Sequence, residues 1–250
     1  MDWRDEAIVL AARPHGESSA VVQLLTRAHG RHAGLVRGGA SRRGRHTVEP
    51  GTMVVATWRA RLADHLGHLT LDPSRQVAAV LLDDPKRLAA LAAAAAVAES
   101  ALPEREPHQG AYDGMAAFLG ALEADEAGAV WPAVYVRWEL GLLGELGFGL
   151  DLNRCAATGT RDDLVYVSPR TGRAVSRAAG APYGDKLLPL PSFLVGGGAV
   201  DAAAIAHGLA LTGHFLARHV FAVLDRPLPA ARTRLVERLV GPGVPPEGRS

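Results

Sequence analysis

The chain has 250 residues, and its 27 Lys and Arg against 26 Asp and Glu give a net charge of +1, which excludes a globally basic or acidic protein. Hydrophobic residues make up 48% and aromatic residues 5%, so a core has to be built mainly from Leu, Val and Ala. The single cysteine, Cys155, excludes an internal disulfide and a multi-cysteine zinc site within one chain. It also fits a reducing compartment. Without a signal peptide or a membrane-length apolar run, we expect a cytoplasmic protein with no membrane contact.

Short apolar runs predict five strands near the N-terminus. They span residues 5–12, 18–27, 31–37, 48–62 and 66–71. Five strands in about 75 residues, separated by Gly-rich turns, indicate a small closed β-barrel. An OB-fold has this appearance, and an SH3-like barrel fits the count almost as well. OB-folds often bind single-stranded nucleic acid by stacking bases on aromatic rings, but only Trp3 and Trp58 are available here, so we expect backbone contacts to dominate.

The 17 residues from Arg31 to Thr47 hold five arginines and no acid, within a first third (residues 1–79) whose eleven Arg against seven acids give it +4. We interpret them as a strand that runs into a flexible Gly/Ser/Arg loop. Guanidinium groups keep their charge and donate paired hydrogen bonds, so they suit a phosphate backbone without reading bases. The candidate DNA contacts are Arg31, Arg37, Arg42, Arg43 and Arg45, extended by Arg59 and Arg61, which alternate with Trp58 and Ala60 on their strand. The alternative is a solvated loop in a protein that uses Arg as its default basic residue.

Helical patterns begin after residue 79. Helices are expected over residues 83–102, 111–125, 130–147, 201–224 and 228–240. In the fourth of them an apolar stripe is expected to face inward, made of Ile205, Leu209, Leu216, Val220 and Val223. The chain is thus predicted to be α+β, with a DNA-binding barrel at 1–79, an α-helical domain at 80–241 and a disordered tail at 242–250.

An irregular segment at residues 148–194 interrupts the helical domain. It is expected to contain a hairpin, with one strand from Leu164 to Ser168, a turn from Pro169 to Gly172 and a return strand from Arg173 to Ser176. Phosphate-loop, dinucleotide and nucleophile-elbow motifs are absent from the sequence. We therefore expect a protein that is not an enzyme and uses no cofactor.

Two stretches together resemble the RecO family of bacterial DNA-repair and recombination mediators. The run GFGLDLNRCAATG…LVYVSPRTGRAVS…AGAPYGDKLLPLPSFL is similar to the family's central signature, and GLVRGGASRR before TVEPGTMVVATW is similar to its barrel loop. The resemblance implies an OB-fold, then an α-helical domain around a small zinc-ribbon-like insertion. It implies a nucleoid-associated protein of the RecF pathway type, which binds single- and double-stranded DNA and anneals complementary strands. Implied partners are RecR, the acidic C-terminal tail of single-stranded-DNA-binding protein and, indirectly, RecA.

The sequence departs from the zinc-binding members of that family. Cys155 matches the first of four cysteines, but Thr158 stands at the next position, and Val175 and Ala178 lie where a second pair is needed. A structural zinc site requires four ligands, which are soft ligands such as cysteine thiolates or histidine imidazoles. We therefore expect a degenerate ribbon without metal, held by apolar packing of Leu164, Tyr166 and Val175, with Cys155 a small buried residue.

The helical domain offers candidate anchors for an acidic partner tail. Such a tail needs a cation beside an apolar pocket, and Arg137, Arg218 and Arg226 lie in or near the helices. Two other functions stay open. One is a general single-strand or RNA-binding barrel, which would bind without annealing. The other is a scaffolding protein whose basic loop contacts an acidic protein.

Overall fold

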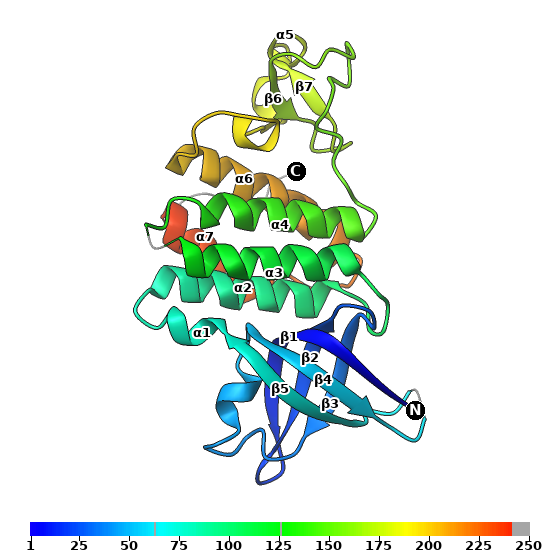
Figure 1. Ribbon diagram of the computed structural model, residues 1–250. Helices are drawn as coiled ribbons and strands as arrows, with labels where there is room; N and C mark the ends of the chain where they lie inside the picture. Colours follow the sequence, from blue (N-terminus) through cyan, green and yellow to red (C-terminus); the bar gives the residue numbers. More distant parts are fainter. Residues whose placement is uncertain (63, 126, 242–250) are drawn as a thin grey trace. The chain divides into compact units, whose positions relative to one another are not determined.

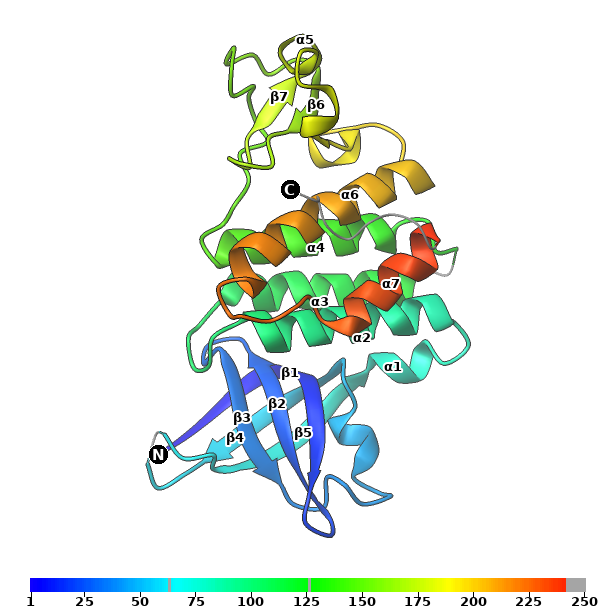
Figure 2. The same cartoon turned by 180° about the vertical axis from the view of Figure 1, so that it is seen from behind.

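A computed structural model describes residues 1–62, 64–125 and 127–241 of the chain (Figures 1 and 2). The chain divides into two compact units, Met1–Glu126 and Ala127–Ser250, which we call the barrel unit and the second unit. The sequence predicts a domain boundary at residue 79, after the last barrel strand. In the structure, the barrel unit extends to residue 126 and includes the next three helices. The tail at 242–250, expected to be disordered, lies outside the described residues.

Five strands form a closed barrel in the order β1-β2-β3-β5-β4. They are β1 (Asp2–His15), β2 (Ser19–Thr26), β3 (Arg31–Val36), β4 (Thr52–Arg59) and β5 (His68–Gln76). All pairs are antiparallel except β3 with β5, which meet only at Leu35 and His68. The α+β prediction with an OB-like barrel is confirmed.

The barrel interior follows from alternation along each strand. In β4, for example, Val54, Ala56 and Trp58 are buried, and the residues between them are not. Side chains of a strand point alternately to its two faces, so every second residue enters the core. The buried set consists of small and branched side chains around one indole, as the low aromatic content predicts. It comprises Ala7, Val9, Ala20, Val22, Leu24, Val36, Val48, Val54, Ala56, Trp58 and Leu69.

Three helices complete the barrel unit: α1 (Val77–Val80), α2 (Pro85–Ala101) and α3 (Gln109–Ala124). The start of α2 is fixed by Asp84, whose carboxylate accepts hydrogen bonds from the backbone N–H groups of Lys86 and Arg87 at 2.9 and 3.0 Å. Pro85 stands in the first turn, where its missing N–H costs nothing. The side chain of Arg87 then donates to the carbonyl of Leu122, which ties α2 to α3.

The second unit contains α4 (Trp131–Glu145), α6 (Ala202–Phe215), the π-helical turn η4 (Leu216–Phe221) and α7 (Ala230–Val240). The predicted hairpin is present as β6 (Leu164–Val167) and β7 (Ala174–Ser176), and β8 (Leu188–Pro189) completes a three-stranded sheet. Around that sheet lie three short turns, α5 (Arg177–Gly180), η2 (Gly184–Lys186) and η3 (Ser192–Leu194). The segment at 148–194 is therefore a small sheet inserted between α4 and α6.

The inward position predicted for Val223 is wrong. Ile205, Leu209, Leu216 and Val220 are buried, but the side chain of Val223 is 77% exposed. The α-helix ends at Phe215, and the following π-turn has a longer repeat, seen in the hydrogen bond from Ala222 N–H to the Ala217 carbonyl. The extra residue in the turn moves later residues off the α-helical stripe.

Candidate nucleic-acid interface

Residues 37–51, which we call the basic loop, connect β3 to β4 by a series of hydrogen-bonded turns. Ser41 is central: its hydroxyl donates to the Gly38 carbonyl at 2.6 Å and accepts from Gly44 N–H at 3.1 Å. The loop is also tied to the β1–β2 turn, because Ala40 N–H donates to the Ser18 carbonyl. A 3₁₀ helix, η1 (Arg45–Val48), leads back to the barrel and buries Val48. The Gly/Ser/Arg tip, expected to be flexible, thus has a hydrogen-bonded conformation in the structure, with a 3₁₀ helix at its end.

Gly44 is required for the close approach of the two halves of the basic loop. A Cβ atom there would lie 2.2 Å from the carbonyl oxygen of Gly38. We expect Gly44→Ala to lower the free energy of unfolding by about 1–3 kcal/mol, as other overpacked positions do. The control is Gly120→Ala in α3, where a Cβ would meet nothing within 4 Å. Urea denaturation of both variants checks this, and equal stability of Gly44→Ala and wild type would contradict it.

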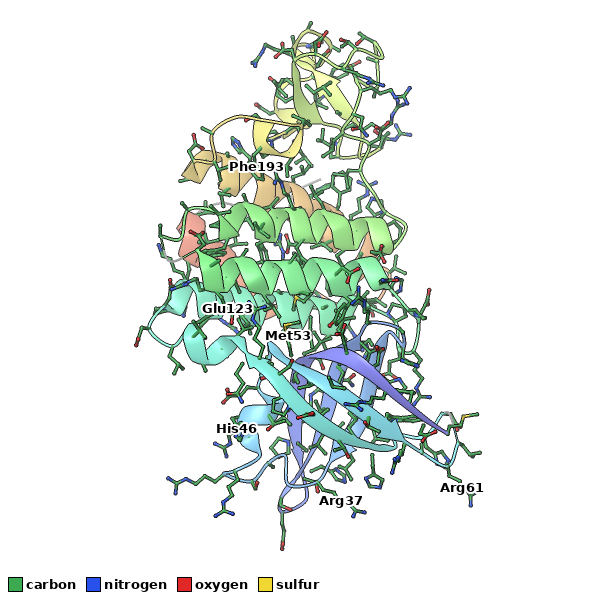
Figure 3. The ribbon with its side chains drawn as sticks, viewed as in Figure 1. Arg37, His46, Met53, Arg61, Glu123 and Phe193 are labelled. Carbon is green, nitrogen blue, oxygen red and sulfur yellow. The ribbon has the colours of Figure 1, made fainter. Side chains whose placement is uncertain are left out.

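Six of the predicted DNA contacts are exposed and have no carboxylate partner among the described residues. They are Arg37, Arg42, Arg43, Arg45, Arg59 and Arg61. Figure 3 shows Arg37 and His46 extending from the loop end of the barrel, while Arg61 lies at a separate corner. Because β4 ends at Arg59, the strand alternation that paired Arg59 with Arg61 does not extend to Arg61.

A hollow of about 520 Å³ lies between the base of the basic loop and residues of β3, β4 and β5. Arg37 and Arg59 both line it, together with His68, which sequence analysis did not single out. Strand register explains the grouping: His68 pairs with Arg59 on one side and with Leu35 on the other, and Arg37 follows Leu35 by two residues. The sequence does not predict this grouping of Arg37, Arg59 and His68, because no local pattern indicates that β3 pairs with β5.

Arg31 differs from the other candidates because its guanidinium group is used inside the barrel unit. It donates to the carbonyl of Leu102 at 2.8 Å and to the side chains of Gln23 and Glu104 at 3.1 Å each. Its side chain is only 15% exposed. Arg31 therefore fastens β3 to the segment after α2, and its charge is compensated.

Other arginines of the barrel unit are also paired. Arg13 contacts Glu99, Arg27 contacts Glu6 and Asp113, Arg75 contacts Glu123, and Arg87 contacts Asp84. The pairs of Arg27, Arg75 and Arg87 lie away from the basic loop, whereas Glu99 of the Arg13 pair lines a hollow that the loop also lines. In the described part of the barrel unit, the exposed arginines without a carboxylate partner lie on the basic loop or at and just beyond the ends of β3 and β4, with Arg4 on β1 as the exception.

The two tryptophans of the barrel offer little free ring surface. Trp58 is 2% exposed, and its indole N–H donates to the carbonyl of Leu66. Trp3 is half-buried and stacks on His29, with ring centroids 4.5 Å apart, and on Trp58 at 5.9 Å. His32 lies edge-on to both indoles, and burial, helped by the charge of Arg105, lowers the pKa of His32 to about 4.

In the second unit the three candidate anchors have different surroundings. Arg137 donates to the Phe193 carbonyl at 2.6 Å, with its guanidinium 6.0 Å from the centre of the Phe193 ring. Arg218 and Arg226 are exposed. They flank an exposed apolar segment in which Val223 and Leu224 are 77% and 43% exposed. The two arginines thus place positive charge next to the exposed apolar side chains of Val223 and Leu224.

The inserted sheet does not provide a zinc site in the residues that the structure describes. No group of three or more His, Cys, Asp or Glu side chains is close enough to hold a metal. Cys155 is 1% exposed, and its sulfur accepts a hydrogen bond from Ser176 N–H at 3.3 Å. Burial alone disfavours the thiolate, but the hydrogen bonds from Ser176 and Thr158 outweigh it and lower the pKa of Cys155 to about 6. The residues present do not fit a tetrahedral zinc centre.

Apolar packing holds the insertion together, as predicted. Leu164 and Val175 are buried, and Tyr166 is half-buried with its ring against Gly180, where a Cβ would come within 2.5 Å.

Among the described residues, no helix combines the length and apolarity needed to cross a membrane.

Comparison with known proteins agrees with the resemblance seen in the sequence. Residues 1–73 match the family described as "Recombination protein O N terminal", and residues 82–225 match "Recombination protein O C terminal". The DNA repair protein RecO of Rhodospirillum centenum is 58% identical over 240 residues, covering 95% of this chain and 94% of the relative. The RecO protein of Phenylobacterium zucineum is also 58% identical, and the match covers 96% of this chain and 98% of the relative. The RecO protein of Cereibacter sphaeroides is 52% identical, with the same two coverages. The chain therefore belongs to the RecO family of DNA repair and recombination proteins.

Proposed function

We propose that the protein is a recombination mediator of the RecF pathway type. It binds single- and double-stranded DNA, anneals complementary strands and helps to load RecA onto DNA coated by single-stranded-DNA-binding protein. It acts as an adaptor without an enzymatic step, in the cytoplasm at the nucleoid. The observation that carries this proposal is the concentration of arginines without carboxylate partners on the basic loop and beside it.

The arginines act on phosphate. Arg42, Arg43 and Arg45 on the basic loop, with Arg37 and Arg59 at the neighbouring hollow, donate hydrogen bonds to phosphate oxygens and neutralise their charge. Two complementary strands repel each other through their phosphates, so neutralising part of that charge lets bases meet. Because the contacts are to the backbone, binding is largely independent of sequence.

The second unit supplies the contacts to protein partners. Arg218 and Arg226 with Val223 and Leu224 offer a cation next to an apolar side chain. This combination suits the acidic C-terminal tail of single-stranded-DNA-binding protein. RecR is the further partner that we propose. Arg137 is a weaker anchor, because its guanidinium is already held by Phe193.

Annealing of complementary oligonucleotides, naked and coated with single-stranded-DNA-binding protein, tests this function. The variant is Arg42→Ala/Arg43→Ala/Arg45→Ala, and the matched control is Arg27→Ala/Arg173→Ala/Arg177→Ala, which removes the same charge from paired arginines. We expect wild type and control to anneal and the loop variant to anneal poorly. Binding without annealing by wild type would indicate a general single-strand-binding barrel. Neither binding nor annealing at low salt would favour a scaffold for an acidic protein.

A further inference from the structure

A second hollow of the barrel unit, of about 500 Å³, lies between β1, the basic loop and α2. Its walls are almost entirely apolar. β1 and β2 contribute Leu10, Ala11, Ala12, Pro14 and Ala20; the loop contributes Gly39, Ala40, Arg45, Val48, Glu49 and Pro50; and α2 contributes Ala92, Ala95, Ala96 and Glu99. We call this hollow the alanine groove. Its volume is in the range of pockets that hold small organic groups.

The alanine groove is continuous with the proposed DNA-binding surface. Gly39, Ala40 and Arg45 belong both to the groove wall and to the basic loop. Arg45 is exposed, and no carboxylate pairs with it within the described part of the chain. A strand whose phosphates contact the loop therefore passes at the mouth of an apolar hollow.

The chemistry of the walls suits a nucleobase. A base is a flat ring with apolar faces, and the rings of Pro14 and Pro50 with the alanine methyl groups offer apolar contact to such faces. Two carboxylates lie at the groove. Glu99 is already neutralised by Arg13 at 2.8 Å, while Glu49 is exposed and can accept a hydrogen bond from an exocyclic amino group.

We propose that the alanine groove binds one unstacked base of a single DNA strand whose phosphates are held by the basic loop. This inference rests on the proposed DNA binding and adds a base-binding subsite to it. Bases in a duplex are stacked and paired, and taking one out costs free energy. The groove therefore favours single strands over duplex, and Glu49 favours bases with an exocyclic amino group over thymine.

The test compares an oligo-dC strand with an abasic strand that has the same number of phosphates. Wild type is compared with Ala96→Leu, which fills the groove, and with Ala92→Leu, at an exposed position that the fold tolerates. The control is Ala117→Leu, an exposed alanine on α3 outside the groove. We expect wild type and control to bind oligo-dC about fivefold more tightly than the abasic strand, the factor for removing on the order of 40 Å² of apolar surface from water. Both groove variants should lose that preference and keep their affinity for the abasic strand.

Equal wild-type affinity for the two strands would overturn the base-binding proposal while leaving the loop's phosphate contacts intact. A preference that survives in both groove variants would overturn it too, because the base would then bind elsewhere. Failure of wild type to bind either strand would instead contradict the proposed function itself.

Discussion

Replacing Arg232 with methionine is expected to lower the free energy of unfolding by about 3–5 kcal/mol, because it leaves an uncompensated buried charge. Arg232 on α7 donates to both carboxylate oxygens of Glu139 on α4, at 2.7 and 3.0 Å. Glu139 is 0% exposed and Arg232 is 3% exposed. The same guanidinium donates to the carbonyl of Leu209, and Thr212 donates to Glu139, so α4, α6 and α7 share one polar network.

Urea denaturation measures this effect, with Arg234→Met as the control, because Arg234 is an exposed arginine of the same helix. The double variant Glu139→Leu/Arg232→Met should recover most of the loss, since removing both charges also removes the desolvation cost. A loss below about 1 kcal/mol in Arg232→Met, the size typical of exposed ion pairs, would contradict the buried network.

Stability of the barrel unit is expected to fall as the pH is lowered from about 6.5 to about 4, because of His32. Its side chain is 4% exposed, both ring nitrogens lack hydrogen-bond partners among the residues that the structure describes, and burial lowers its pKa from 6.5 to about 4. The unfolded chain therefore takes up a proton in this window while the folded barrel does not. By linkage, the contribution of the neutral, buried His32 to the free energy of unfolding is fully present above pH 6.5. It decreases by roughly 3 kcal/mol when the pH falls to 4.

Thermal unfolding across this pH range, for wild type and His32→Phe, measures the effect. Phenylalanine keeps a ring between Trp3 and Trp58 but cannot be protonated, so its stability should depend less on pH. His46→Leu, at an exposed position of the basic loop, should follow wild type. Identical pH profiles for wild type and His32→Phe would contradict the role of His32.

Much of the fold follows from local patterns in the sequence. Two-residue alternation predicts the barrel strands, and Asp84 with Pro85 predicts the start of α2. The hairpin of β6 and β7 is predicted by its turn from Pro169 to Gly172. In each case the signal lies within a few residues of the element it predicts.

Features that depend on distant residues could not be predicted. Arg31 and Arg37 look alike in sequence, but Arg31 is held by the carbonyl of Leu102, which lies 71 residues away. The partners Glu139 and Arg232 are 93 residues apart. The exposure of Val223 follows from a π-turn that the apolar pattern of the helix does not indicate.

The salt dependence of single-strand binding tests the central claim most directly. Each phosphate contact contributes roughly 0.7 to the slope of log affinity against log salt. We predict that Arg42→Ala/Arg43→Ala/Arg45→Ala reduces the slope by about 2, while Arg27→Ala/Arg173→Ala/Arg177→Ala, which changes the net charge equally, leaves it nearly unchanged. An unchanged slope in the loop variant, or an equal reduction in both variants, would contradict a DNA-binding site on the basic loop.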